Sequence, residues 1–376
     1  MTPVQHIDAD ILTPQGFVRG RLEYAEGRVS AIHGSPVTES QVRHDAGARK
    51  IVLPGFIDVH VHGGGGHDTM EGGNAAGEIA RLHVRHGTTS MLATTMTAPL
   101  DEIRSALSAL GPFCAQRAPG SARLLGVHLE GPYINPGKLG AQPDFAKPAT
   151  LAEIHALHAL APIRLITLAP ELPGTLELIS ELRAEGFQVQ IGHTAGTYED
   201  GVQALAHGAG GFTHLFNAMS GLHHREPGMV GAALAHAKFA EIIPDLLHVH
   251  PGAIRVAMRS IPCMFCVTDS TAAAGMPDGE YSLGRHRVTK CMGGVRLPDG
   301  TLAGSTLTMD QALRNLVGLG LEIEDASRRV STYAADYMGL EDRGRLQPGA
   351  WADFVVLDRD LQLQGVVVEG EEIDLA

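Results

Sequence analysis

Beyond residue 54, apolar segments typical of buried strands alternate with Ala- and Leu-rich segments typical of helices. Near-continuous apolar strands joined by helices indicate a parallel sheet that is covered on both faces. Eight strands are expected, at residues 55–62, 88–96, 123–131, 163–171, 187–194, 211–219, 240–249 and 263–270. Helices are expected between most of them, at residues 74–87, 101–111, 151–161, 174–186 and 198–209.

Eight strand–helix units predict an α/β protein with a (β/α)8 TIM-like barrel. A doubly wound open sheet is the alternative, but no early strand is followed by a glycine fingerprint in the required context. The two chain ends differ from the middle, because both contain short alternating runs separated by Gly and Pro. We therefore expect residues 1–53 and 343–376 to form one small β-sandwich domain, and residues 54–342 to form the barrel.

Composition excludes several classes of protein. The formal net charge is -13 and there is no basic run, which argues against a nucleic-acid partner. No apolar run approaches the length of a membrane span and the N-terminal residues lack a signal pattern, so a cytoplasmic protein is expected. The four cysteines suit a reducing compartment. Cys263 and Cys266 lie in an apolar strand and are interpreted as two buried strand residues rather than as a metal or redox pair.

Polar side chains recur where the predicted strands end. In a barrel enzyme the carboxyl ends of the strands meet at one face and form the active site. His60 and His62 share one face of the first strand, because residues i and i+2 of a strand point the same way. The other strand-end residues are Glu130, His193, His214, Asn217, His248 and Asp269. Histidine nitrogens with a carboxylate are ligands that zinc and similar divalent ions prefer. Each histidine alone is more often structural, but their joint placement predicts a metal site, with Asp269 as ligand, base or both.

Six sequence motifs resemble those of the amidohydrolase superfamily, and more closely those of N-acetylglucosamine-6-phosphate deacetylases. They are "PGFIDVHVHGGGG", "HLEGPY", "IGHT", "THLFNAMSGLHHREPG", "VTDS" and "DGTLAGSTLTMDQALRNLV". The resemblance implies a barrel with a small β domain built from both chain ends, and a homodimer. It also implies one or two divalent ions, with Zn²⁺ expected and Fe²⁺, Mn²⁺ or Co²⁺ as alternatives.

The resemblance also assigns roles to matching residues. Glu130, His193 and His214 correspond to the principal metal ligands, His60 and His62 to ligands of a second ion, and Asp269 to the catalytic aspartate. Arg225 corresponds to a residue that reaches the substrate phosphate across the dimer interface; its alternative is a surface ion pair with Glu226. The implied substrate contacts are Ala141, Gln142, Asn217, Ala218, Arg225, His248, Leu302, Ala303 and Gly304.

Two segments depart from the family pattern. Gln142 stands where the family commonly has His, and "PDLLHVH" replaces the usual "ADGxHV". We expect Gln142 to keep a hydrogen-bonding role, the alternative being a loop residue without contacts. The expected activity is removal of acetate from N-acetylglucosamine 6-phosphate. Alternatives are the galacto-configured substrate, another amide such as a cyclic amide or an acylated amino acid, and a non-catalytic barrel that binds a sugar phosphate.

Overall fold

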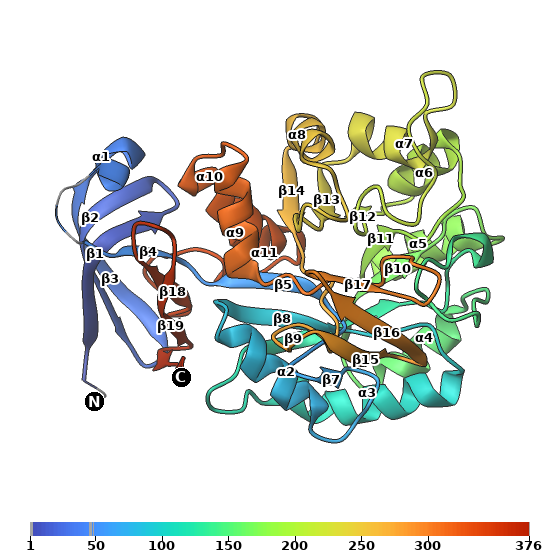
Figure 1. Ribbon diagram of the computed structural model, residues 1–376, viewed down its shortest axis with the longest axis horizontal. Helices are drawn as coiled ribbons and strands as arrows, with labels where there is room; N and C mark the ends of the chain where they lie inside the picture. Colours follow the sequence, from blue (N-terminus) through green and yellow to red (C-terminus); the bar gives the residue numbers. More distant parts are fainter. Residues whose placement is uncertain (1–2, 45–46, 48, 376) are drawn as a thin grey trace.

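The computed structural model describes residues 3–44, 47 and 49–375, and it has a small β-sheet layer beside a large α/β barrel (Figure 1). The small layer is a seven-stranded sheet with the order β20-β19-β18-β4-β1-β2-β3. Its strands are β1 (Gln5–Thr13), β2 (Gly16–Ala25), β3 (Arg28–Pro36), β4 (Ile51–Pro54), β18 (Phe354–Leu357), β19 (Leu363–Val368) and β20 (Glu371–Glu372). The fold class expected from the sequence is confirmed.

Strand β4 joins the two ends of the chain within this sheet. It pairs in parallel with β1 and antiparallel with β18, so that Val52 lies opposite both Ile11 and Val356. Apolar side chains from both ends pack together, and the rings of Tyr24 and Phe354 meet edge to face with centroids 5.3 Å apart. The N and C termini lie on the same side of the molecule (Figure 1).

Eight parallel strands form the barrel. Six of them make one sheet in the order β12-β11-β10-β9-β8-β5, and β13 pairs with β14. Backbone hydrogen bonds connect the two sheets on both sides, from Asp269 N to His60 O (2.9 Å) and from Leu215 N to Glu241 O (2.9 Å). The strands are β5 (Phe56–Val61), β8 (Thr88–Thr94), β9 (Arg123–Glu130), β10 (Ile163–Leu168), β11 (Gln188–Ile191), β12 (Gly211–Phe212), β13 (Phe239–Ile242) and β14 (Cys263–Cys266).

Helices cover the outside of the barrel. All five helices expected between the barrel strands are present, and α7 and α8 are additional helices between them. A helical region after the last barrel strand includes a π-helical turn at Arg328–Thr332. The helices are α1 (Glu39–His44), α2 (Ala75–Val84), α3 (Leu100–Ala115), α4 (Leu151–His158), α5 (Thr175–Ala184), α6 (Tyr198–Ala206), α7 (Gly228–His236), α8 (Pro251–Ser260), α9 (Met309–Gly318), α10 (Ile323–Ser327) and α11 (Tyr333–Tyr337). None of the described helices has the length and apolar character needed to cross a membrane.

A three-stranded antiparallel sheet interrupts the barrel pattern and was not expected from the sequence. It consists of β15 (Gly279–Leu283), β16 (His286–Cys291) and β17 (Gly294–Arg296), inserted between β14 and α9. This sheet lies along the barrel on the side away from the seven-stranded sheet (Figure 1). The expectation of two buried cysteines in β14 was half right, since Cys266 is buried whereas Cys263 is partly exposed.

A network of ion pairs connects the seven-stranded sheet to the barrel. Glu369, just after β19, binds Arg123 at the start of β9 (2.9 Å) and Arg117 (3.1 Å). Buried Arg343 bridges Glu369 and Asp353 from the other side. Because buried charges are costly unless they are paired, these contacts fix how the two layers meet.

Candidate metal centre and active site

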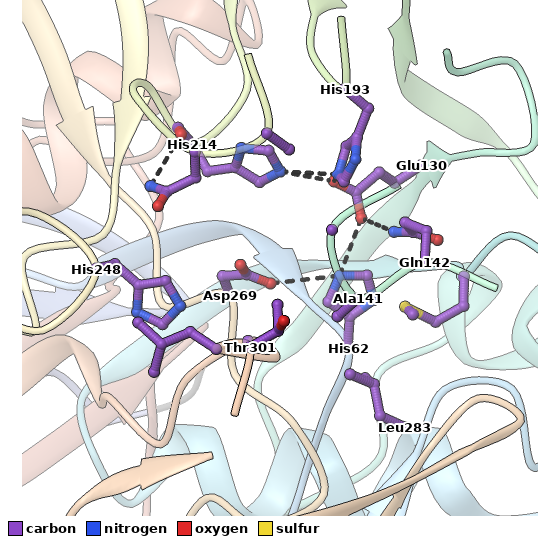
Figure 2. A pocket seen from close by; sticks show the side chains of 16 residues that line it. His62, Glu130, Ala141, Gln142, His193, His214, His248, Asp269, Leu283 and Thr301 are labelled. Carbon is purple, nitrogen blue, oxygen red and sulfur yellow. Dashed lines mark hydrogen bonds and ion pairs between the residues drawn. The ribbon is translucent and has the colours of Figure 1, made fainter. Parts of the chain in front are cut away.

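The carboxyl ends of the barrel strands bring six polar side chains to one place. His60 lies in β5 and His62 directly follows it, and Glu130 is the last residue of β9. His193, His214 and Asp269 come two or three residues after β11, β12 and β14. Figure 2 shows most of these side chains pointing toward one another. All six are buried, with exposed fractions between 0% for His60 and 8% for Asp269.

Glu130 lies between two groups of ligand atoms. Its Oε1 is 3.2 Å from Nε2 of His193 and 3.1 Å from Nε2 of His214, and the two histidine nitrogens are 3.1 Å apart. Its Oε2 is 3.1 Å from Nε2 of His62 and 3.5 Å from Nε2 of His60. One carboxylate therefore faces both groups.

The second group consists of His60, His62 and Asp269. Nε2 of His60 and Nε2 of His62 are 3.2 Å apart, and Oδ1 of Asp269 is 3.5 Å and 3.4 Å from them. Ligands of a tetrahedral zinc ion bound at about 2.0–2.1 Å are separated by about 3.3 Å. Both groups match this spacing, and their nitrogen and oxygen atoms are the donors that a divalent ion takes. The residues fit one or two such ions.

The ionisable groups of this cluster shift one another's pKa. Burial lowers the pKa of His60, but the nearby carboxylates of Glu130, Asp269 and Glu241 outweigh burial and raise it well above its usual value. Burial raises the pKa of Glu130, but His60, His193 and His214 hold it well below its usual value. A site that attracts protons in this way also attracts a metal cation, which competes with protons for the same lone pairs.

Contacts behind the ligands orient them. Nδ1 of His193 donates to the backbone oxygen of Lys138 (2.8 Å), which leaves Nε2 free to face Glu130. Nδ1 of His60 lies 3.0 Å from Oε2 of Glu241, a buried carboxylate in β13 that the sequence analysis missed. The available signal was a single acidic residue in the otherwise apolar run "FAEII" of a barrel strand.

The backbone is strained at three of the six strand-end residues and at nearby Ala218. His193, His214, Ala218 and Asp269 have positive φ angles of 48°, 28°, 50° and 50°. Residues other than glycine rarely adopt this conformation, and it concentrates at functional sites where the surrounding structure imposes it. All four residues line the cavity described next.

A cavity opens above the two ligand groups and contains most of the residues expected to contact substrate. Its lining includes Ala141, Gln142, Asn217, Ala218, His248, Leu302 and Gly304, together with Met96, Leu283 and Thr301. Ala303 is fully buried and lies outside the lining. His248 is held by Asp245, whose Oδ2 lies 2.6 Å from its Nδ1, and this carboxylate outweighs burial and raises the pKa of His248.

Gln142 contacts one candidate metal ligand directly. Its side-chain amide donates to Oε2 of Glu130 (2.6 Å), and its oxygen accepts the backbone N–H of Thr97 (2.7 Å). The side chain is 6% exposed. The alternative of a loop residue without contacts is therefore wrong.

Arg225 lies outside this cavity. It is exposed in the segment between β12 and α7, and its guanidinium donates to Nε2 of His224 (2.8 Å). It lines a separate hollow with Tyr198 and His223. Within one chain, the structure does not bring Arg225 together with the metal-site residues.

The model of the amidohydrolase family matches residues 51–373, so the chain belongs to the amidohydrolase family. Two relatives place it within the group that contains the amino-sugar 6-phosphate deacetylases. An N-acetylgalactosamine-6-phosphate deacetylase of Escherichia coli O157:H7 is 38% identical, over 96% of this chain and 97% of the relative. An N-acetylglucosamine-6-phosphate deacetylase of Lysinibacillus sphaericus is 39% identical, over 86% of each chain.

Solved structures agree with this assignment. The N-acetylglucosamine-6-phosphate deacetylase of Thermotoga maritima has a TM-score of 0.90 and 32% identity, covering 98% of this chain and 99% of its own. A mutant of the Mycobacterium smegmatis deacetylase, solved in complex with N-acetyl-D-glucosamine-6-phosphate, has a TM-score of 0.90 and 33% identity, covering 99% and 100%.

Proposed function

We propose that this chain hydrolyses the acetamide of an N-acetylated hexosamine 6-phosphate, with N-acetylglucosamine 6-phosphate as its substrate, to give the free amino sugar phosphate and acetate. The observation that carries the proposal is the placement of Glu130 between two buried ligand groups, at the base of a cavity that also contains Asp269. We assign the chemistry to residues 54–342, and a supporting β domain to residues 1–53 and 343–376.

Glu130, His193 and His214 would hold the principal ion, and His60 and His62, with Asp269 beside them, a second one. A bound divalent ion supplies a Lewis acid for the amide carbonyl and lowers the pKa of a water molecule. Zn²⁺ suits the nitrogen-rich donor set, and Fe²⁺, Mn²⁺ and Co²⁺ share the preference for imidazole and carboxylate.

Asp269 is our candidate for the proton carrier. Its carboxylate lies at the cavity wall, on the last barrel strand, and a small part of it remains exposed. In this role Asp269 accepts a proton from the attacking water and delivers it to the departing amine, because an amine leaves readily only when protonated. Its backbone is left-handed, with a φ angle of 50°.

Polar groups of the cavity suit the sugar, and the phosphate calls for a Lys or Arg from elsewhere. Asn217, His248 and the backbone of Leu302–Gly304 can bind hydroxyl groups. No Lys or Arg is among the residues that line the cavity in the described chain. We propose that Arg225 of a second copy supplies the phosphate contact in a homodimer, since a guanidinium binds phosphate with two parallel hydrogen bonds.

The galacto-configured substrate is the second candidate. The observation that favours it is Gln142, which occupies the cavity wall at the position where the resemblance to the family implies His. Sequence identity favours neither sugar, because an N-acetylgalactosamine-6-phosphate deacetylase and an N-acetylglucosamine-6-phosphate deacetylase both match over 96% of this chain. The two sugars differ in the direction of one hydroxyl group, so a change in one hydrogen-bonding side chain is enough to alter preference.

The test is acetate release from a small panel of substrates by protein of known metal content. The panel contains both N-acetylhexosamine 6-phosphates, both unphosphorylated sugars and an N-acetyl amino acid. We expect fast release from a 6-phosphate and slow release from the others. Release only from the amino acid would overturn the proposed substrate class, and no release by metal-loaded protein would overturn catalysis.

A further inference from the structure

Glu241 is a buried carboxylate for which the proposed reaction has no role. It lies in β13 between Ala240 and Ile242 and is 0% exposed. Placing a carboxylate in a protein interior is costly unless hydrogen-bond donors or cations compensate it. The partners of Glu241 therefore indicate what it does.

Both partners belong to segments that carry candidate metal ligands. Oε2 of Glu241 faces Nδ1 of His60 at 3.0 Å and accepts the backbone N–H of His214 at 3.2 Å. Oε1 has no hydrogen-bond partner among the described residues. A single oxygen atom thus connects β5 to the turn that follows β12. The strands β5 and β12 are not neighbours in the barrel.

The contact with His60 determines which ring nitrogen is free. A neutral imidazole has one N–H and one lone pair, and a carboxylate accepts a hydrogen bond but cannot donate one. Nδ1 must therefore carry the proton, which leaves the lone pair on Nε2. That Nε2 points toward His62 (3.2 Å) and Asp269 (3.5 Å), the other members of its ligand group.

This arrangement is specific to His60. Behind His193 there is a backbone oxygen, and Nδ1 of His62 and Nδ1 of His214 have no hydrogen-bond partner among the described residues. Of the four histidines in the two ligand groups, His60 is the one with a carboxylate behind its ring. An outer carboxylate fixes the orientation of a ligating imidazole and increases its basicity.

We propose that Glu241 is a positioning residue for a divalent ion held by His60, His62 and Asp269, and that it sets the affinity of this ion separately from that of the ion at Glu130, His193 and His214. The inference rests on the metal centre of the proposed function. It adds that occupancy by two ions would depend on a residue in the barrel interior that belongs to neither of the two ligand groups.

The test compares Glu241→Met and Glu241→Gln with wild type. Methionine has a similar length but no good hydrogen-bond acceptor, whereas glutamine keeps an amide oxygen at the position of Oε2 and loses the charge. Metal-free protein is titrated with Zn²⁺ in competition with a chromophoric chelator, and bound zinc per chain is measured by elemental analysis. Circular dichroism of the metal-free proteins checks that each variant is folded.

We expect wild type to bind two ions. In Glu241→Met the affinity for one ion falls by about 10- to 100-fold, while the other affinity changes by less than about threefold. Glu241→Gln shows a smaller loss, because the amide oxygen still accepts from Nδ1. In a His60→Ala background, which has already lost this ligand, adding Glu241→Met causes no further loss of zinc affinity.

Two results would overturn the inference while leaving the metal centre intact. One is unchanged affinity for both ions in Glu241→Met. The other is an equal loss at both ions that persists in the His60→Ala background, which would show a general structural role. Wild-type protein that binds a single ion, lost in His193→Ala but not in His60→Ala, would also overturn it. Wild type that binds no ion would overturn the metal centre itself.

Discussion

Gln142 donates a hydrogen bond from its side-chain amide to Oε2 of Glu130, with 2.6 Å between the two heavy atoms. The other end of the same amide accepts the backbone N–H of Thr97. Because both ends are engaged, the orientation of the amide is fixed. The residue therefore holds one oxygen of the carboxylate that lies between the two ligand groups.

Replacing Gln142 tests what its two hydrogen bonds contribute to activity and stability. Gln142→Ala should lower kcat/KM by about 10- to 100-fold, because a hydrogen bond to a charged group contributes roughly 1.5–3 kcal/mol. The free energy of unfolding should fall by about 1–2 kcal/mol, because the Thr97 N–H loses its acceptor. Steady-state kinetics on both 6-phosphates and denaturant unfolding measure the two effects. Gln142→His should change the ratio between the epimers, and an Ala variant equal to wild type would eliminate the role.

Asp269→Asn should reduce kcat by about 100- to 10,000-fold, the usual effect of removing a general acid and base. The ion at Glu130, His193 and His214 should remain, because Asp269 is not a member of that group. Elemental analysis of the variant accompanies the kinetics. Activity within about tenfold of wild type would remove Asp269 from the mechanism.

The two ligand groups should respond differently to mutation. Glu130→Gln and His193→Ala should each abolish or greatly weaken binding of the principal ion, since three protein ligands are the usual minimum for a catalytic zinc site. His60→Ala should lose at most one of two ions. Bound zinc per chain after dialysis decides the matter, and complete metal loss in His60→Ala would reverse the ranking of the ligands.

Arg225→Ala should remove most of the preference for phosphorylated substrate. Loss of a charge-assisted bond should lower kcat/KM for the 6-phosphate by about 10- to 100-fold and leave the unphosphorylated sugar almost unaffected. Arg255, which is also exposed but lies in α8, provides a matched control as Arg255→Ala. Equal turnover of both sugars by wild type would contradict the phosphate contact.

The ion-pair network between the two layers predicts a pH-dependent stability. Burial raises the pKa of Glu369, but Arg123 and Arg343 outweigh burial and hold it at about 2. An unfolded glutamate has a pKa of about 4.3. The stabilisation is therefore complete above that value and is lost as the pH falls from about 4.5 toward 2.

Glu369→Gln should thus lower the free energy of unfolding by roughly 2–3 kcal/mol at pH 7. The difference from wild type should stay constant from pH 7 to 5 and narrow below about 4.5. Denaturant titrations at several pH values measure it. Glu371→Gln is the control: Glu371 also pairs with Arg117 but is more exposed, so its effect should stay below about 1 kcal/mol. A difference that widens in acid would refute the assignment.

The sequence predicted the barrel strands well because buried parallel strands are nearly uninterrupted apolar runs. It predicted their ends poorly where the site begins. Residues 211–219 were expected to form one strand, but β12 ends at Phe212, because His214, Phe216 and Ala218 all take left-handed backbone angles. Those angles depend on tertiary contacts that no local pattern contains.

The inserted sheet β15–β17 was missed because its strands are short and mostly part-exposed, and they lack a continuous apolar run. At the two-residue turn Met292–Gly293 both residues have positive φ, and the glycine is the part of this turn that the sequence signals. Glu241 was missed for a different reason. A lone carboxylate in an apolar run acquires meaning only when its neighbour His60, distant in the chain, is known.

The pairing of β4 with strands from both ends of the chain has a consequence for how the chain is made. On the ribosome, β1 to β4 emerge first, but the partner strand β18 of β4 is synthesised about 300 residues later. Until then β4 presents an open edge, which is a template for pairing with other chains. Closing such a distant pair is entropically slow. Completion of the small sheet is therefore a late step, and the interval before it is when the nascent chain is most exposed to aggregation and to binding by chaperones.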